Sequence, residues 1–132
     1  MNLTPDTNIL VRAIVRDDPR LAETASALLD GADQIVLTNQ ALCELAWVLR
    51  RSYKTKPADL ALTIRTLIAA HNVLCDHERV QFGLAMLDRG GDFANGVIAA
   101  EGAAMGGGVF VSFDKDAVRD VKALGLEARA VR

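Results

Sequence analysis

The sequence has few residues that could form disulfides or soft-metal sites, with only two cysteines and two histidines. Cys43 and Cys75 both lie in apolar surroundings, where buried free thiols are more common than a disulfide or a metal site. His71 and His77 have no partner at a spacing typical of zinc ligands. These absences argue against a disulfide-bonded secreted protein and against a zinc enzyme. They fit a reducing cytoplasm.

Long apolar runs and a basic excess are also missing. No apolar run reaches the roughly 18 residues that a membrane span requires. The chain does not open with the basic and then apolar segments that mark a secretory signal. The formal net charge is −2, whereas nucleic-acid-binding domains usually carry an obvious basic excess. We therefore expect a cytoplasmic protein without membrane association, and composition leaves its substrate open.

The basic residues are nonetheless unevenly distributed. They form two groups, namely Arg12, Arg16 and Arg20 near the N-terminus, and Arg50, Arg51, Lys54 and Lys56 around Tyr53. Solvated helix faces and a rim that contacts phosphates explain these groups equally well. Both interpretations stay open at this point.

The chain contains a regular alternation of strand and helix signals. With 51% hydrophobic residues among 132, it can bury the core of one domain over residues 1–132. Strands are predicted at Asn2–Pro5, Gln34–Leu37, Asn72–Cys75, Val109–Ser112 and Glu127–Val131. Helices are predicted at Ile9–Arg16, Pro19–Leu29, Asn39–Tyr53, Pro57–Ala70, from the Asp76 cap to Leu87, at Phe93–Met105 and at Asp114–Leu124. The alternation implies an α/β fold with a central parallel sheet of about four to five strands and helices on both faces.

Two aspartates follow predicted strands. Asp6 comes directly after the first strand, and Asp114 comes after the strand Val109–Ser112. If these strands are neighbours, both carboxylates lie in one crevice beyond the carboxyl ends of the strands, where ligands collect in parallel sheets. Taken singly, each aspartate is more simply explained as a helix cap.

Glu44 and Asn95 are polar residues on helix faces that are otherwise largely apolar. Trp47 and Val48 neighbour Glu44 on its helix, which predicts that Glu44 projects from a core-facing stripe. An ionised carboxylate there is costly unless it is paired or binds a metal. A salt bridge to an arginine and a partly exposed position are the alternatives. Asn95 also points toward the packed side of its helix, whereas Asp92 is expected to cap that helix.

Carboxylates that converge from separate elements suit a hard divalent cation. Mg²⁺ and Mn²⁺ prefer oxygen ligands, and Mg²⁺ accepts further ligands from a substrate phosphate. Such an ion lowers the pKa of a bound water and offsets the charge that develops on a phosphodiester. The sequence has neither the nucleophile elbow of a serine hydrolase nor a Gly-x-x-x-x-Gly-Lys loop. The pattern therefore favours metal-assisted hydrolysis.

Four segments of the sequence resemble, in order, the motifs of PIN domains. They are Asp6–Arg12, Leu42–Leu49 around Glu44, Asp92–Ala100, and Val111–Asp114. Their order, their spacing and the chain length look like the VapC toxins of bacterial toxin–antitoxin pairs. The resemblance implies a Mg²⁺- or Mn²⁺-dependent endoribonuclease that forms a homodimer and cleaves structured RNA such as transfer RNA. It also implies neutralisation by a VapB antitoxin, with DNA contacted only through that antitoxin.

The resemblance also assigns roles to individual residues. By position, Asp6, Glu44 and Asp114 would bind the metal directly or through water. Asn8 and Ser112 would support these acids by hydrogen bonds. Asp92 and Asp116 would be secondary metal-site acids. The candidate RNA contacts are Arg12, Arg50 and Lys54, which are chosen only because they lie near the motifs in the sequence.

Position 95 departs from the family pattern. The family motif usually reads Asp-Phe-Ala-Asp, and its second aspartate is a metal-site acid, whereas this chain has Asn95 there. Asparagine keeps a carbonyl oxygen but has no negative charge. Asn95 therefore stays among the predicted catalytic and metal-binding residues, and we expect a lower metal affinity and a lower rate of RNA cleavage than with aspartate. The site is either naturally weakened or reassigned, or an engineered change lets cells survive an active toxin. A non-catalytic binding partner in a toxin–antitoxin complex is the rival function.

A receiver-like signalling domain shares the chain length and the alternation of strands and helices. It needs paired acids after the first strand and a phosphoacceptor aspartate after a central strand. Asp17 and Asp18 instead follow a predicted helix, and Gln34–Leu37 is followed by Thr38 and Asn39. The sequence therefore disfavours this class.

Overall fold

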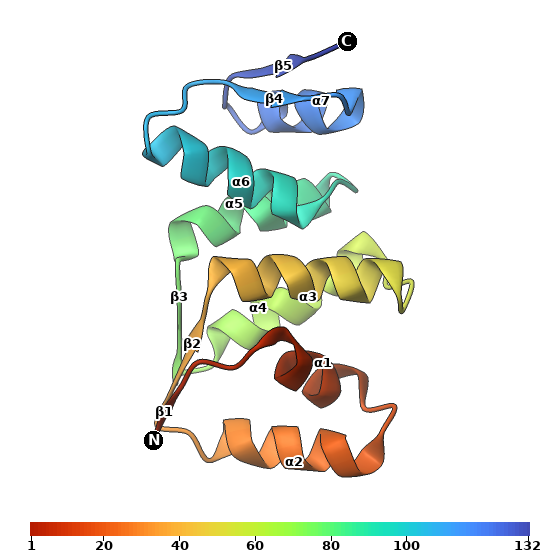
Figure 1. Cartoon of the computed structure of the whole chain (residues 1–132), viewed down its shortest axis with the longest axis vertical. Coiled ribbons are helices and arrows are strands. Elements are labelled where there is room, and N and C mark those ends of the chain that lie inside the picture. The colour runs from red at the N-terminus through yellow and green to blue at the C-terminus, as the bar shows by residue number, and fades with distance from the viewer.

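The molecule is elongated, and its two termini lie at opposite ends of the long axis (Figure 1). The computed structural model describes residues 1–132. Its helices are α1 Thr7–Val15, α2 Pro19–Asp30, α3 Asn39–Arg51, α4 Pro57–Ala69, α5 His77–Asp88, α6 Phe93–Ala104 and α7 Lys115–Ala123. Its strands are β1 Asn2–Leu3, β2 Gln34–Leu37, β3 Val73–Cys75, β4 Phe110–Ser112 and β5 Ala128–Ala130. None of the helices combines the length and the apolar character that a membrane span needs.

Several helices begin at the predicted residues because side chains cap their first turns. Asp18 accepts a hydrogen bond from the Leu21 N–H at 3.2 Å, and Pro19 is the first residue of α2. Asp76 accepts from the Arg79 N–H at 3.3 Å at the start of α5. These carboxylates satisfy N–H groups that the first turn of a helix leaves without a partner.

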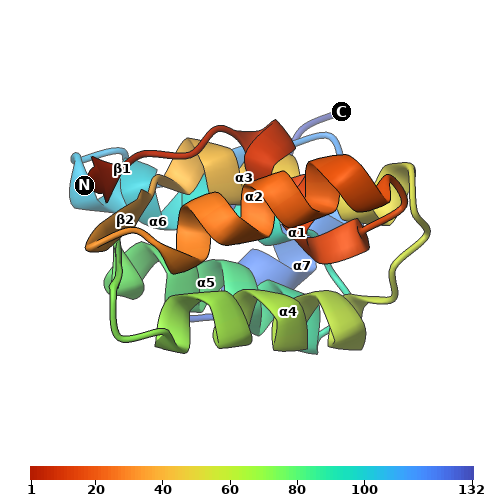
Figure 2. The same ribbon diagram turned by 90° about the horizontal axis from the view of Figure 1, so that it is seen from below.

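The strands form two separate parallel sheets, so the prediction of one sheet with four to five strands was wrong. β1, β2 and β3 pair in that order, and β4 pairs only with β5. In both ribbon views, β1 and β2 lie at one edge of the molecule (Figures 1 and 2). Local patterns identify strands but not their partners, which long-range packing selects. As a result, β1 and β4 are not neighbours.

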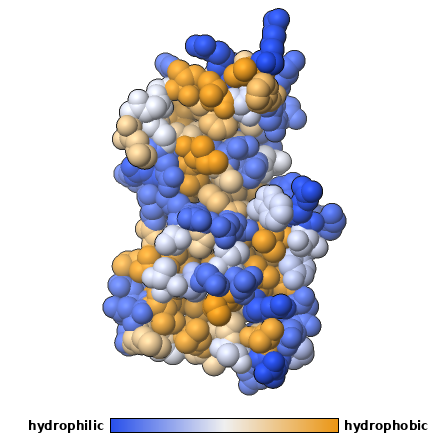
Figure 3. All heavy atoms as spheres, in the orientation of Figure 1, coloured by the Kyte–Doolittle hydropathy of each residue, from blue (hydrophilic) through white to orange (hydrophobic).

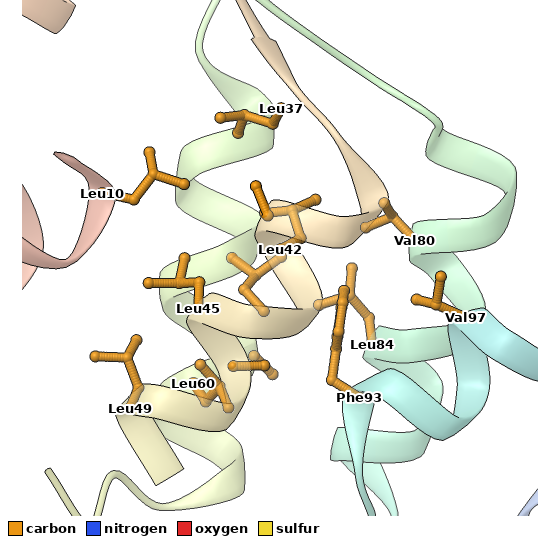
Figure 4. Close-up of a cluster of buried hydrophobic side chains, with 14 of the residues drawn as sticks. Leu10, Leu37, Leu42, Leu45, Leu49, Leu60, Val80, Leu84, Phe93 and Val97 are labelled. Atoms are coloured by element: carbon orange, nitrogen blue, oxygen red, sulfur yellow. The ribbon is translucent and has the colours of Figure 1, made fainter. Parts of the chain in front are cut away.

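One apolar core of 18 buried residues joins α1, α3, α4, α5 and the start of α6. Leu42, Leu45 and Leu49 form a buried stripe on α3 and lie near Leu60 of α4 and Phe93 of α6 (Figure 4). Burial of a leucine side chain contributes about 1.5–3 kcal/mol. This stripe therefore fixes the rotation of α3 and turns its opposite face toward solvent.

A second, smaller core attaches α7 to α5 and α6. It contains Met86, Ala99 and Val121. Close by, the carboxylate of Asp120 is only 3% exposed and accepts a hydrogen bond from Arg89 Nε at 3.1 Å. A buried carboxylate requires such a partner. These contacts hold α7, β4 and β5 at the end of the molecule opposite β1 (Figure 1).

The close packing of α5 against α6 depends on Gly96. A Cβ atom at this position would overlap the Phe82 carbonyl group and the Met86 side chain. The two helices can approach so closely only because glycine has no side chain. Asn95 directly precedes Gly96 on α6 and is half-buried.

Candidate active site

Asp6 and Glu44 lie together in a surface pocket between α1 and α3, which Asn8 also lines. Thr7 Oγ donates a hydrogen bond to Glu44 Oε2 at 2.7 Å, and Gln40 Nε2 donates to Glu44 Oε1 at 3.4 Å. Thr7 therefore connects the first turn of α1 to α3 and holds the Glu44 carboxylate beside Asp6. Thr7 was not among the site residues predicted from the sequence, although it directly follows Asp6 in the first motif.

Glu44 is exposed to solvent, so the prediction that it projects from a core-facing stripe was wrong. Trp47, on the same side of α3, is 58% exposed, whereas Leu42 and Leu45 are buried. The prediction failed because the apolar side chain of Trp47 indicated burial that the fold does not provide. No arginine pairs with Glu44, and its hydrogen bonds come from Thr7 and Gln40.

A second pocket, with a volume of about 480 Å³, is lined by the candidate site residues from the later part of the chain. Asn95 and Asp114 line it, and Asp92 and Asp116 do so as well. The basic side chains that line it are Arg50, Arg51, Lys54 and Arg119. The residues of the predicted acidic cluster therefore line two different pockets.

Three of the candidate aspartates cap helices, which is the role expected from the sequence for each of them taken singly. Oδ1 of Asp6, Asp92 and Asp114 accepts hydrogen bonds from backbone N–H groups of α1, α6 and α7, at 3.2, 3.0 and 2.9 Å respectively. In each case Oδ2 makes no hydrogen bond within the chain. A cap at one oxygen therefore leaves the other oxygen available to a ligand.

Arg119 provides a positive charge inside the larger pocket. Its Nη1 donates to Asp116 Oδ1 at 3.0 Å, and its Nε donates to Asp120 Oδ1 at 3.2 Å. The hydrogen bond to Asp120, followed by the charges of Asp120, Asp116 and Asp114, raises the pKa of this guanidinium. The secondary candidate Asp116 is therefore already in an ion pair. The spacing of three residues within a helix was the signal for this pair.

Cys43 lies on α3, near acidic residues from both pockets. Burial, followed by the negative charges of Glu101, Asp92 and Glu44, raises the pKa of its thiol to about 11. The thiol is therefore protonated at neutral pH, whereas the thiolate is the form that attacks carbon or binds metals. Cys43 and Cys75 are both free, as expected from the sequence, but both are partly exposed and not buried as expected.

The acids of one chain do not form a metal-binding cluster. No group of three or more Asp, Glu, His or Cys side chains lies close enough together to hold a metal ion. Carboxylate and amide oxygens are suitable donors for Mg²⁺ or Mn²⁺, but Asp6 and Glu44 line one pocket while Asn95 and Asp114 line the other. The arrangement within one chain therefore does not fit the ion. The expected meeting of Asp6 with Asp114 fails because β1 and β4 are not neighbours.

Trp47 contributes to the walls of both pockets. The Arg51 guanidinium lies 5.7 Å from the centroid of its ring, within the range of a cation–π contact. Exposed aromatic rings beside basic groups are typical platforms for stacked nucleobases. Trp47 was not predicted as a functional residue from the sequence, although it follows Glu44 by three residues and precedes Arg51 by four.

Asn8 and Ser112, the two predicted supporting residues, occupy different positions. Ser112 Oγ accepts a hydrogen bond from the Asp114 N–H at 3.0 Å and so fixes the turn between β4 and α7. Asn8 lines the pocket of Asp6 and Glu44, but it donates no hydrogen bond to either acid. Ser112 thus positions the backbone of an acid, and Asn8 is free to contact a ligand.

Only two of the three candidate RNA contacts line a pocket. Arg50 and Lys54 line the larger pocket. Arg12 instead forms an ion pair with Asp17 at 3.4 Å, and Asp17 also accepts a hydrogen bond from the Tyr53 hydroxyl at 3.2 Å. Arg12 therefore lies outside both pockets, and Arg50 and Lys54 are the better placed pair.

Comparison with known protein families gives a match to the PIN domain over residues 3–124. The matched span contains every candidate acid from Asp6 to Asp116. No curated protein matches the chain significantly.

Proposed function

Because the chain belongs to the PIN domain family, we propose that it is a metal-dependent endoribonuclease. PIN domains are generally nucleases that use divalent metals. The observation that carries the proposal is the pair of carboxylates, Asp6 and Glu44, which Thr7 holds together at the surface. Trp47 lies beside this pair and separates it from a pocket with basic residues. Acidic groups for hydrolysis and groups that bind RNA are thus adjacent.

Arg50 and Lys54 are the proposed phosphate contacts. Each phosphate contact to single-stranded nucleic acid contributes about −0.7 to the slope of log affinity against log salt. Replacement of both residues by alanine should therefore reduce the magnitude of that slope by about 1.4. An unchanged slope and affinity in this double variant would remove both residues from the RNA-binding surface.

The finer proposal is a VapC-type toxin that cleaves structured RNA such as transfer RNA. It is supported by the order of the motifs around Asp6, Glu44, Asn95 and Asp114 and by the length of the chain. The cofactor in this proposal is Mg²⁺ or Mn²⁺, and the chain forms a homodimer in the cytoplasm, where free cysteines persist. A VapB-like antitoxin covers the acids, and DNA is contacted only through that antitoxin.

A non-catalytic binding partner in a toxin–antitoxin complex is the second candidate function. It is favoured by the amide at Asn95 and by the separation of the acids within one chain. In this case the chain would bind RNA or its antitoxin without breaking a phosphodiester bond.

Incubation of the purified protein with total transfer RNA and Mn²⁺ separates the two functions. The nuclease proposal predicts discrete fragments from the unaltered chain, none after EDTA treatment and none from Asp6→Ala. Leu62→Ala is the matched control, because this exposed α4 side chain lines neither pocket, and it should cleave normally. Identical fragments from Asp6→Ala would contradict the proposal. Binding without cleavage, in Asn95→Asp as well, would support the second candidate.

A further inference from the structure

The larger pocket is lined by the end of α3 and the start of α6, which are on the same side of the molecule (Figure 1). α3 and the loop after it supply Arg50 and Lys54, and neither side chain forms an ion pair. Hydrophilic side chains gather on this side of the molecule (Figure 3). The start of α6 supplies Asp92 and Asn95. The pocket therefore combines free cationic groups with a carboxylate and an amide.

Asn95 has an amide group without a partner in the chain. The residue is half-buried and is the third residue of α6 after the Asp92 cap. In a capping box, the side chain at this position accepts a hydrogen bond from the backbone N–H of the cap residue. That bond is not formed here, and the cap consists of the Ala94 N–H donating to Asp92 Oδ1 at 3.0 Å. The amide donor and the amide acceptor of Asn95 are therefore both available to a molecule in the pocket.

Asp92 supplies a carboxylate oxygen beside this amide. Residues three apart at the start of a helix are neighbours on one face, with about 5–6 Å between their Cβ atoms. Asp92 Oδ1 is occupied by the cap, whereas Oδ2 makes no hydrogen bond within the chain. The pocket thus presents a carboxylate acceptor next to an amide donor.

Guanine is the nucleobase that this pair of groups matches best. Its Watson–Crick edge has two adjacent donors, N1–H and N2–H, next to the O6 acceptor. A carboxylate accepts from both donors, and an amide N–H donates to O6. Adenine and cytosine have only one amino donor on this edge. Uracil has one N–H between two carbonyl oxygens, which a carboxylate repels.

Lys54 has a left-handed backbone conformation, with a φ of 57°. This conformation favours glycine and is strained for a residue with a side chain. The hydrogen bond from the Thr55 N–H to the Leu49 carbonyl, at 2.9 Å, holds the backbone in place around it. Strained non-glycine residues cluster at ligand-binding sites. Because Lys54 also lines the pocket, its ammonium group gives a functional reason for a lysine where glycine fits the backbone better.

We propose that the larger pocket binds a guanine nucleotide, either free or as a guanosine within single-stranded RNA. The base stacks on Trp47, its Watson–Crick edge contacts Asp92 and Asn95, and its phosphate contacts Arg50 and Lys54. The pocket volume of about 480 Å³ lies within the range of roughly 300–1,000 Å³ that is typical of small-molecule sites. Stacking combined with hydrogen bonds to the Watson–Crick edge is a common mode of recognition for single nucleobases.

These contacts need neither a metal ion nor the cleavage of a phosphodiester bond, so the inference goes beyond the proposed nuclease function. They also give the amide at position 95 a specific role. An ionised aspartate there has no N–H to donate to O6 and would repel it, whereas Asn95 can donate.

Calorimetric titration with GMP, AMP, CMP and UMP in EDTA tests the base preference without any metal ion. A correct base pairing contributes a discrimination of about 5- to 150-fold, and we expect GMP to bind more tightly than UMP within this range. A second arm uses oligouridylates that contain one guanosine or one adenosine. A guanine preference in both arms supports the proposal, and a preference in RNA alone assigns the site to a strand. No guanine preference in either arm would overturn it. A guanine preference without RNA cleavage in Mn²⁺ would refute only the nuclease function.

Inosine monophosphate separates recognition by Asp92 from a structural role. It lacks the 2-amino group of GMP and should bind the unaltered chain about tenfold or more weakly than GMP, because a hydrogen bond to a charged acceptor is lost. Asn caps helices as well as Asp does, so Asp92→Asn should fold normally. This variant should bind the two nucleotides with equal affinity. A preference for GMP that Asp92→Asn retains in full would overturn the assignment of the base edge.

Lys54→Gly tests the phosphate contact. Glycine relieves the backbone strain, so the variant should be at least as stable as the unaltered chain in urea, yet it should bind GMP more weakly and guanosine, which has no phosphate, equally well. Arg16→Gly is the matched control, because Arg16 also has a positive φ, of 59°, but lines neither pocket. It should bind GMP normally. Unchanged GMP affinity in Lys54→Gly, or an equal loss in Arg16→Gly, would overturn the phosphate contact.

Discussion

Replacement of Trp47 by alanine tests whether the surface between the two pockets binds nucleobases. The Trp47 side chain is 58% exposed, and one basic group, Arg51, lies over its ring. Its loss should therefore affect folding little. Loss of an aromatic platform costs about 1–3 kcal/mol for each stacked base, which corresponds to roughly 5- to 150-fold weaker binding. We expect the affinity of Trp47→Ala for single-stranded RNA to fall within this range.

Fluorescence provides a direct assay because Trp47 is the only tryptophan in the chain. Titration of the unaltered protein with a short single-stranded RNA should quench its emission, and EDTA in the buffer prevents metal-dependent cleavage. Anisotropy of labelled RNA then gives the affinities of the variants. Trp47→Phe retains an aromatic face and should lose less affinity than Trp47→Ala, while Leu62→Ala should bind normally.

An abasic oligonucleotide separates stacking from charge. It has the same phosphates and sugars as the RNA but no nucleobases. It should therefore quench Trp47 weakly, and it should bind Trp47→Ala and the unaltered chain equally. Equal quenching by the abasic and normal strands would refute the stacking role of Trp47. An affinity of Trp47→Ala for normal RNA that stays within about twofold of the unaltered chain, well below the stacking estimate, would refute it as well.

Three further perturbations test the site and the core. Asn95→Asp adds a carboxylate to the larger pocket and should strengthen Mn²⁺ binding; calorimetric titration that shows equal or weaker affinity would contradict the weakened-site interpretation. The Cys43 thiol, with a pKa of about 11 instead of the ordinary 9.0, should react with iodoacetamide about 100-fold more slowly at pH 8 than an unperturbed thiol, because only the thiolate attacks. Its rate should rise about tenfold per pH unit below the pKa, and a plateau near pH 9 would contradict the burial of the thiol. Leu45→Ala, at a fully buried position, should lower the free energy of unfolding by about 2–5 kcal/mol in urea denaturation, whereas a loss no larger than that of Leu62→Ala would contradict the described core.

The positions of most elements were predictable because their signals are local. Asp18 followed by Pro19 predicts the start of α2, and Asp76 predicts the start of α5, since a cap acts within one helical turn. β2 has the predicted bounds, Gln34–Leu37. In each case the residues that determine the element are its own residues or immediate neighbours.

The orientation of Glu44 was not predictable in the same way. Trp47 and Val48 make its side of α3 look apolar, and an apolar side chain does not reveal whether the fold buries it or exposes it. Packing of Leu42 and Leu45 against other helices decided the rotation of α3. That rotation leaves both Glu44 and Trp47 at the surface.

By itself the sequence determined the alternation of strands and helices, the four ordered motifs and the oxygen donors that they carry. These are properties of the chain; the observed elements confirm the alternation, and the family match over residues 3–124 confirms the resemblance to PIN domains. Only the tertiary structure decided which donors meet. Asp6 meets Glu44 through Thr7, whereas Asp114 follows a strand that is not paired with β1. Strand pairing joins residues far apart in the sequence, so no local pattern could specify it.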